Sequence, residues 1–274
     1  MTIPIFQRLE LVIGNDATAA MTRQNVIVVG VGGVGSWCAE ALVRNGVGKI
    51  TIVDSDQICV TNVNRQLMAT SENVGKVKVF ELRDRLLTIN PALQITALQK
   101  IYSRDTAEEF NLSDYDYVID AIDSVSCKVE LLIRTLGSSA TLFSSLGAGG
   151  RIDATQIRAA SIWKSHGCRL GHFVRKRLRE RLPNRAKGFD FKCVYSIEEP
   201  VEPFPSSIGC GTGQCLCPKS AAADSELDPH EWCSLKKQIN GSTVHVTATF
   251  GMFLAGLVLQ DVVEKIKRSA DIVS

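Results

Sequence analysis

A strand, a glycine-rich turn and a helix follow one another without a break near the start of this chain, and this order strongly constrains the fold. The run NVIVV (25–29) is apolar and β-branched, which is typical of a strand buried on both faces of a sheet. GVGGVGS (30–36) follows it and leads into helical spacing that continues to Asn45. A second strand, KITIVD (49–54), comes next. This alternation predicts an α/β fold: a Rossmann-like, doubly wound and mainly parallel sheet.

The pattern continues through both halves of the chain. Further strands are predicted over 115–123, 141–149, 151–163 and 192–200, and further helices over 6–14, 76–90 and 125–137. Residues 242–268 are predicted to form a strand or turn that leads into a buried helix. Because there is no internal repeat or linker, we expect one domain over 1–274. Within it, 1–150 is the nucleotide-binding half and 151–274 is a mixed C-terminal extension.

Composition narrows the class of protein. The chain has 274 residues, 45% of them apolar, and a net charge of +2, which argues against disorder and against a globally basic nucleic-acid binder. The first 25 residues lack the pattern of a signal peptide. The longest apolar stretch, 250–259, is too short to span a bilayer. We therefore expect a cytoplasmic protein without an integral membrane segment, whose nine cysteines form no structural disulfides.

The glycine-rich turn predicts a phosphate-binding loop. Glycines allow a tight turn and close approach of the backbone to a phosphate, while the helix start offers unpaired N–H groups. The glycines concerned are Gly30, Gly32, Gly33 and Gly35. Asp54 ends the second strand, where it and Asp56 are placed to accept hydrogen bonds from a ribose. These features alone leave the nucleotide open between NAD and ATP.

The segment after the second strand favours ATP. Arg65 and Lys78 supply cations that a buried triphosphate needs and a dinucleotide does not. Asp123, at the end of the predicted strand 115–123, is well placed to hold Mg²⁺. Side-chain amides for the same pocket are available at Asn62, Asn64 and Gln66.

These motifs together resemble the adenylating enzymes related to ubiquitin activation, which include the molybdopterin-synthase and thiamine-biosynthesis adenylyltransferases. The resemblance spans residues 6–150. It implies adenylation of a carboxylate by ATP, with Arg65, Lys78 and magnesium-bound Asp123 around the triphosphate. It also implies a homodimer in which Arg8 enters the active site of the neighbouring subunit.

The second half is similar to one branch of that superfamily, the transfer-RNA threonylcarbamoyladenosine dehydratases. The similarity rests on VYSIEEP (194–200), the basic stretch before it, and INGSTVHVTATFG (239–251). It implies that the carboxylate belongs to a threonylcarbamoyl group on an adenosine beside the anticodon, and that ring closure removes one water. The segment 210–233 departs from the pattern.

A basic segment is independently consistent with an RNA partner. Nine basic and two acidic residues lie between Arg169 and Lys192. Val174, Leu178 and Leu182 recur every four residues, so one face of a helix is expected to pack while the cations project outward. Such a helix can follow a phosphate backbone, although a solvated amphipathic helix shows the same pattern. The predicted tRNA-binding residues are Arg175, Lys176, Arg179 and Lys187.

The cysteines distinguish the competing hypotheses. Carrier-protein adenylyltransferases usually hold zinc with two CxxC pairs, and this chain has neither. An improvised zinc site from Cys168, Cys210, Cys215 and Cys217 is the remaining metal hypothesis. Cys233 is predicted to be an accessory thiol.

Three alternatives to an RNA-modifying cyclase stay open. The first is an adenylyltransferase for the C-terminal glycine of a ubiquitin-like sulfur carrier. The second is an NAD-dependent oxidoreductase, which leaves Arg65, Lys78 and Asp123 unexplained. The third is a scaffold that binds ATP without releasing pyrophosphate. Whichever function holds, a cysteine-desulfurase or sulfur-acceptor system is a candidate partner beside tRNA.

Overall fold

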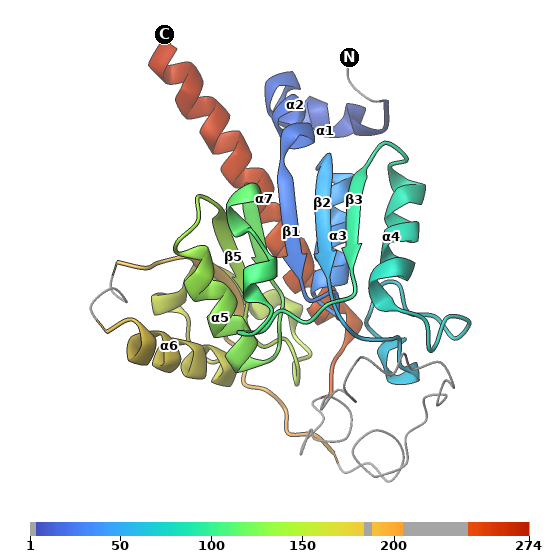
Figure 1. Ribbon diagram of the computed structural model, residues 1–274, viewed down its shortest axis with the longest axis vertical. Helices are drawn as coiled ribbons and strands as arrows, with labels where there is room; N and C mark the ends of the chain where they lie inside the picture. Colours follow the sequence, from blue (N-terminus) through green and yellow to red (C-terminus); the bar gives the residue numbers. More distant parts are fainter. Residues whose placement is uncertain (1–3, 184–187, 205–240, 274) are drawn as a thin grey trace.

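One sheet runs through both halves of the chain. The computed structural model describes residues 4–183, 188–204 and 241–273 (Figure 1). Within these residues the sheet has seven strands in the order β3-β2-β1-β4-β5-β7-β6, and only β6 runs antiparallel to its neighbour. The strands are β1 Asn25–Val29, β2 Lys49–Val53, β3 Gln94–Leu98, β4 Tyr117–Asp120, β5 Thr141–Ser145, β6 Ile157–Ser161 and β7 Lys192–Ser196. The predicted Rossmann-like sheet with a mixed C-terminal extension is confirmed.

Helices cover both faces of the sheet (Figure 1). Side chains of α3, α4 and α7 share one core cluster with alternate strand residues, and side chains of α5 and α6 share a second cluster on the other face. The helices of the described chain are α1 Gln7–Ile13, α2 Asn15–Arg23, α3 Gly35–Arg44, α4 Lys78–Ile89, α5 Val125–Thr135, α6 Arg169–Arg181 and α7 Val244–Val273.

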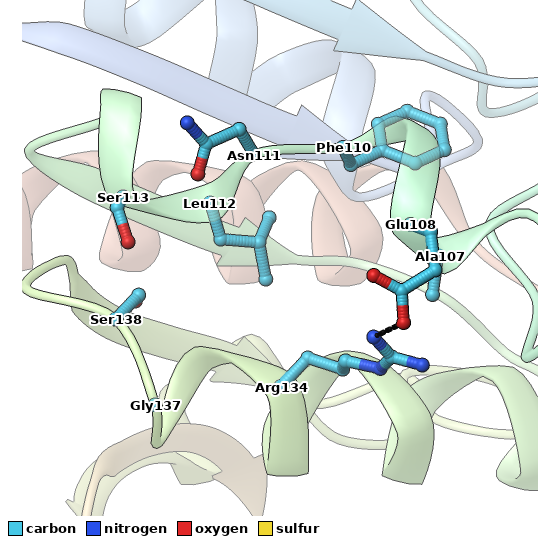
Figure 2. Close-up of a pocket in the computed structure, with 9 residues that line it drawn as sticks. All are labelled: Ala107, Glu108, Phe110, Asn111, Leu112, Ser113, Arg134, Gly137 and Ser138. Atoms are coloured by element: carbon cyan, nitrogen blue, oxygen red, sulfur yellow. Dashed lines mark hydrogen bonds and ion pairs between the residues drawn. The ribbon is translucent and has the colours of Figure 1, made fainter.

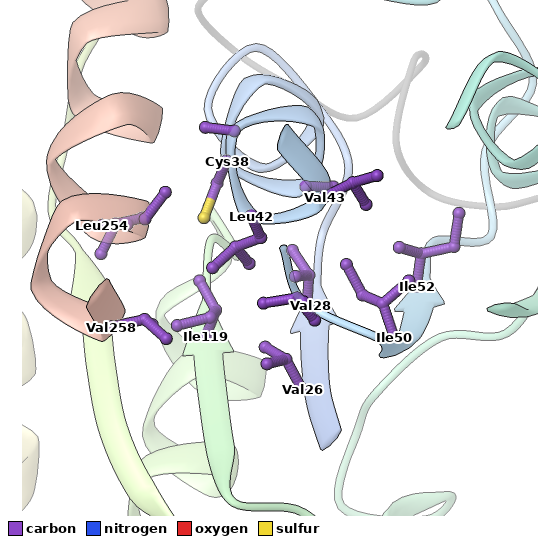
Figure 3. Close-up of a cluster of buried hydrophobic side chains, with 14 of the residues drawn as sticks. Val26, Val28, Cys38, Leu42, Val43, Ile50, Ile52, Ile119, Leu254 and Val258 are labelled. Atoms are coloured by element: carbon purple, nitrogen blue, oxygen red, sulfur yellow. The ribbon is translucent and has the colours of Figure 1, made fainter. Parts of the chain in front are cut away.

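The two core clusters explain why the central strands are mostly apolar on both faces. Val26 and Val28 face α3 and α7 (Figure 3). Ile27, between them, belongs to the opposite cluster. Alternate residues therefore enter two separate cores, and neither face is available to water. Burying a side chain of this size contributes about 1.5–3 kcal/mol. Packing on both faces therefore fixes the positions of the residues that follow the carboxyl ends of the strands.

Two elements were not predicted, and several bounds differ. The edge strand β3 is half exposed and lacks the continuous apolar run of the central strands. Helix α2 is short and was also missed. Strand β4 ends at Asp120 rather than Asp123, and the segment from 151 becomes a strand only at Ile157. No strand precedes α7 within the described residues from 241 onward.

Helix α7 is long and apolar enough to meet the length and hydropathy criteria for a membrane span. Half of that apolar window is buried inside the protein. Phe250, Leu254 and Val258 are fully buried in the cluster that α7 shares with α3. A Cβ on Gly251 would lie 2.6 Å from the carbonyl oxygen of Val34, so the two helices touch closely there. The apolar side of α7 therefore belongs to the core.

Candidate active site

The candidate site begins with the turn between β1 and α3. Gly30 has φ +88°, and a Cβ there would lie 2.8 Å from the carbonyl oxygen of Ala121, just beyond β4. A Cβ on Gly35 would lie 1.8 Å from the carbonyl oxygen of Gly30. Only glycine fits both positions. The turn therefore packs against the end of β4, and the chain order reverses between β1 and β4, where α/β sheets bind ligands.

A second segment is tied across this turn. The Ser36 hydroxyl donates to the carbonyl oxygen of Gly32 at 2.6 Å and accepts from the Leu67 N–H at 3.2 Å. The Trp37 indole donates to the carbonyl oxygen of Arg65 at 3.0 Å. The first residues of α3 therefore hold the Asn-Arg-Gln segment over the glycines.

Arg65 and Gln66 lie over those glycines and form one wall of the candidate site. We call this site the cradle; it consists of the glycine-rich turn, Arg65, Gln66, Lys78 and Asp54. A Cβ on Gly33 would lie 3.3 Å from Cγ and Cδ of Arg65, and one on Gly32 would lie 3.8 Å from Nε2 of Gln66. Gln66 is 6% exposed, and its Oε1 has no hydrogen-bond partner. A buried acceptor without a partner is costly, which indicates a ligand donor at this point.

The guanidinium of Arg65 is partly removed from water. It donates to the carbonyl oxygen of Thr61 at 2.8 Å and to Oδ1 of Asn64 at 3.0 Å. Burial lowers the pKa of Arg65, while the side chains of Cys59 and Asp123 oppose that shift. Asp123 is therefore electrostatically coupled to Arg65 across the candidate site.

Lys78 lies between the two predicted ribose acids. Its ammonium is 2.7 Å from the Asp56 carboxylate and 4.0 Å from the Asp54 carboxylate. Asp54 also accepts from the backbone N–H groups of Val31 at 2.8 Å and Asp56 at 3.0 Å. The hydrogen bond to Val31 connects the acid directly to the glycine-rich turn.

The charges of this cluster depend on one another. Burial raises the pKa of Asp54 more than Lys78 and the two N–H donors lower it. Burial alone would lower the pKa of Lys78, but Asp54 and Asp56 together raise it. Lys78 is consequently positively charged at neutral pH. It lies beside Asp54, which accepts a hydrogen bond from Val31 of the glycine-rich turn.

The two asparagines hold the segment together. Oδ1 of Asn62 accepts from the N–H of Cys59 at 3.0 Å and closes the short 3-10 helix Val60–Asn62. Nδ2 of Asn64 donates to the carbonyl oxygen of Ser242, just before α7, at 2.9 Å. Both amides therefore have local partners, a role that the sequence pattern did not predict.

A buried ion pair supports the segment that carries Asp123. Nζ of Lys128 donates to Asp120 at 2.6 Å and to the carbonyl oxygen of Ser145 at 2.9 Å, and both charged side chains are fully buried. The other Asp120 oxygen accepts from the N–H of Ile122 at 3.1 Å. Asp123 itself is exposed at the carboxyl edge. Sequence reasoning missed Lys128, although a lysine in the apolar pattern of 125–132 was a signal.

Arg8 lies away from the cradle of its own chain. Helix α1 packs at Gly46, beyond the C-terminus of α3, where a Cβ would lie 3.7 Å from Leu9 and 3.9 Å from Phe6. The glycine-rich turn lies at the other end of α3, about 15 Å away for a ten-residue helix. Figure 1 shows α1 at the opposite end of the sheet from the loops that follow β1 and β2. Arg8 is exposed there.

Helix α6 has the predicted amphipathic form, with Val174 and Leu178 fully buried. Lys176 is exposed, and Arg179 is exposed with its guanidinium 5.3 Å from the ring of Trp163. The expectation that Arg175 projects outward is wrong. Its guanidinium donates to the Ser165 hydroxyl at 2.5 Å because position 175 borders the packed face. Lys187 lies outside the described residues.

Cys168 is the cysteine of the zinc hypothesis that lies within the described residues. Cys168 is buried, and its sulfur accepts from the N–H groups of Gly147 at 3.3 Å and Gly171 at 3.4 Å, which caps α6. No group of three or more potential metal ligands occurs among the described residues. The remaining cysteines of these hypotheses, Cys210, Cys215, Cys217 and Cys233, lie outside those residues.

Comparison with known proteins agrees with this geometry. The ThiF family model matches residues 6–267. The chain belongs to the ThiF family. Within that family it is 35% identical over 258 residues to tRNA threonylcarbamoyladenosine dehydratase of Escherichia coli, covering 93% of this chain and 92% of that protein. It is 40% identical over 196 residues to the protein of that name from Bacillus subtilis, covering 72% of this chain and 76% of the relative.

A solved structure gives the same result for the fold of this ThiF-family chain. The structure of E. coli tRNA N6-threonylcarbamoyladenosine dehydratase, TcdA, in complex with ATP matches with a TM-score of 0.80 and 32% identity. The match covers 97% of this chain and 96% of that one. The resemblance predicted from the motifs is therefore confirmed for both halves.

A separate depression lies away from the glycine-rich turn of the ThiF-family fold (Figure 2). It has a volume of about 170 Å³ and lies between the segment 107–113 and the C-terminal end of α5. Its cation, Arg134, pairs with Glu108 and with Glu130. Since both carboxylates neutralise this guanidinium, the depression is a salt-bridged surface feature rather than an anion site.

Proposed function

We propose that this protein is an ATP-dependent tRNA-modifying enzyme that dehydrates N6-threonylcarbamoyladenosine beside the anticodon. The observation that carries this proposal is a match along nearly the whole chain to a relative of that name, 93% of one and 92% of the other. The cradle of glycines, cations and acids supports the same activity. We assign ATP binding to residues 1–150, and substrate binding and part of the dimer contact to 151–274, within one domain.

ATP fits the side chains of the cradle. The glycine-rich turn and the start of α3 offer backbone N–H groups to phosphates, and Asp54 is placed for a ribose. The unpartnered Oε1 of Gln66 can accept a hydrogen bond from the nucleotide. Arg65 and Lys78 supply positive charge for the triphosphate. Asn62 and Asn64 support the segment that carries Arg65.

Magnesium fits the acidic side of the same site. Asp123 is an exposed carboxylate at the carboxyl edge, and oxygen ligands suit Mg²⁺. When bound with ATP, the ion would neutralise phosphate charge. The Lys128–Asp120 pair would hold the 120–123 segment in place for this purpose.

The proposed reaction has two balanced steps. A carboxylate oxygen of the threonylcarbamoyl group attacks the α-phosphorus of ATP, and pyrophosphate leaves. The carbamoyl group then attacks the acyl carbon and loses a proton, and AMP leaves with the former carboxylate oxygen. Fixed cations stabilise the charge that develops on the phosphoryl oxygens. This reaction proceeds without a protein nucleophile, so Cys233 is at most an accessory thiol.

A homodimer would complete the site. Arg8 is too far from its own cradle to reach it, so the role that the resemblance implies for Arg8 requires the site of a second copy. The same helix exposes Leu11 and Val12, which are 82% and 83% accessible. Such apolar side chains suit a contact between subunits. We place this enzyme in the cytoplasm, where tRNA is its substrate and α6 contributes Lys176 and Arg179 to RNA binding.

The proposed function is tested by substrate competition. The protein is incubated with ATP, Mg²⁺ and either tRNA carrying threonylcarbamoyladenosine or a carrier protein ending in Gly-Gly, and pyrophosphate release is measured. We expect release only with the modified tRNA; unmodified tRNA is the matched control. Release only with the carrier protein would instead establish a sulfur-carrier adenylyltransferase.

A further inference from the structure

Arg151 is a buried cation that no carboxylate pairs within the described part of the chain. It is 3% exposed. Nη1 donates to the carbonyl oxygens of Gly147 at 2.6 Å and Gly149 at 3.1 Å, and Nη2 donates to that of Gly167 at 3.1 Å. Its Nε has no partner. Carbonyl dipoles offset only part of the cost of burying a full charge, so this arrangement requires an explanation.

The guanidinium holds a loop at the carboxyl edge of the sheet. Gly147 and Gly149 come directly after β5, and β5 is the neighbour of β4, which leads to Asp123. Gly167 comes just before α6. One side chain therefore joins the end of β5 to the start of the basic helix, on the side of the site that faces away from Asp54.

The first turn of α7 places this loop next to the nucleotide cradle. The Thr243 hydroxyl donates to the carbonyl oxygen of Arg151 at 3.0 Å. One helical turn later, Cβ of Thr247 lies 3.3 Å from the position that a Cβ on Gly33 would occupy. A single turn advances about 5.4 Å, so the loop borders the phosphate end of the cradle.

A carboxylate from the segment VYSIEEP (194–200) completes the support of this loop. Glu198 accepts from the N–H of Ile152 at 3.0 Å and from the N–H of Asp153 at 3.0 Å. It holds the backbone after Arg151 rather than the guanidinium. Among the described residues, the positive charge of Arg151 is therefore offset only by carbonyl dipoles, and it lies near the place where an anionic group must approach the α-phosphorus.

We propose that Arg151 is a positioning residue for the carboxylate substrate. It holds the 147–150 loop that borders this carboxylate, and its charge, which no carboxylate of the described residues pairs with, favours the anionic substrate over a neutral one. Because the guanidinium is buried, it acts through the loop and through its field rather than by contact. This inference rests on the proposed function, since the carboxylate is that of the threonylcarbamoyl group.

The experiment compares binding of two RNA hairpins, one carrying threonylcarbamoyladenosine and the other its methyl ester. The Kd of each is measured for the full-length wild-type protein and for Arg151→Met and Arg151→Lys. The matched control is Arg158→Met, because Arg158 also donates to two backbone carbonyls but is exposed on β6. Thermal unfolding and the Kd for ATP show whether each variant keeps its fold and nucleotide site.

We expect wild type and Arg158→Met to bind the acid in preference to the ester. Arg151→Met should reduce that ratio about tenfold, as expected for losing one charge near the carboxylate. Arg151→Lys should restore most of it. The Kd for ATP should rise by no more than about tenfold, because the same charge lies near the phosphates. An unchanged acid-to-ester ratio in folded Arg151→Met would overturn the role of Arg151.

The outcome for Arg151 is separable from the outcome for the proposed function. If wild type converts the acid hairpin with ATP but Arg151→Met keeps the full preference, only the inference about Arg151 fails. If wild type neither converts the acid hairpin nor prefers it to the ester, both fail. Should Arg151→Met not fold, Arg151→Gln decides, because it removes the charge and keeps a hydrogen-bond donor: a preference below that of wild type with ATP still bound supports the role, and an unchanged preference contradicts it.

Discussion

The ammonium of Lys78 lies 2.7 Å from the Asp56 carboxylate and 4.0 Å from the Asp54 carboxylate, so the predicted phosphate cation and the predicted ribose acids form one cluster. Lys78 and Asp54 are almost inaccessible to water. A nucleotide that approaches this cluster therefore meets groups already held in place by one another. Preorganised charges of this kind lose little energy to rearrangement when the ligand binds.

Lys78→Met should weaken ATP binding and lower stability together. The substitution leaves Asp54 buried without its cation, so we expect the free energy of unfolding to fall by about 2 kcal/mol. The Kd for ATP should rise at least about tenfold, since one charge next to a phosphate is removed. Denaturant unfolding and calorimetric ATP titration measure the two effects. Lys76→Met is the matched control, because Lys76 is exposed and pairs with Glu81; equal effects in both variants would contradict the role of Lys78.

Asp123→Asn should abolish turnover while leaving RNA binding intact. The change keeps the size of the side chain but removes the negative charge assigned to magnesium. We expect the rate of pyrophosphate release to fall at least about 100-fold, as for loss of a group that stabilises a reacting phosphate. The Kd for tRNA should change less than twofold. Asp84→Asn on the exposed side of α4 serves as control, and normal turnover in Asp123→Asn would remove Asp123 from the site.

Lys176→Ala combined with Arg179→Ala should weaken tRNA binding. Both side chains are exposed on α6, whereas Arg175 is engaged with Ser165 and is a poor choice for this test. Each lost phosphate contact should reduce the slope of log Kd against log salt by about 0.7–0.9. Filter binding at several salt concentrations measures this slope, with Lys267→Ala at the far end of α7 as control. An unaltered slope would separate α6 from RNA recognition.

Glu40→Gln should lower stability at neutral pH but not in acid. Burial would raise the pKa of Glu40, but hydrogen bonds from Arg85 and Arg44 lower it below its ordinary 4.5 overall. A lowered folded-state pKa gives stability that is present above 4.5 and lost as the pH falls through the folded value. We expect a difference of about 1–2 kcal/mol at pH 7 that shrinks below pH 4.5. The free energy of unfolding is measured for wild type, Glu40→Gln and the exposed control Glu72→Gln at pH 7 and below pH 4.5. A difference between wild type and Glu40→Gln that is the same at both pH values would contradict the prediction.

The central strands and the glycine-rich turn could be predicted because their causes are local. A strand buried on both faces is mostly apolar, and Gly30 and Gly35 are required by backbone contacts that permit no Cβ. The edge strand β3 could not be predicted in the same way, since its half-exposed residues carry no continuous pattern.

The supporting residues of the site depend on contacts between distant segments. Arg151 donates to Gly167, and Glu198 accepts from Ile152, across intervals that no periodicity spans. Helical spacing correctly placed Val174 and Leu178 inside, but it could not show that Arg175 bends toward Ser165. Residue types thus indicated which groups could bind a nucleotide, while the fold decided which of them hold one another in position.

The most direct test follows an oxygen atom through the proposed reaction. Transfer RNA in which both oxygens of the threonylcarbamoyl carboxylate are ¹⁸O is incubated with the protein, ATP and Mg²⁺, and AMP and the nucleosides are analysed by mass spectrometry. Adenylation of the carboxylate predicts one ¹⁸O in each AMP, formed in step with a nucleoside that has lost one water. AMP without ¹⁸O would contradict carboxylate adenylation by this protein. So would the formation of unlabelled AMP while the threonylcarbamoyl nucleoside stays unchanged.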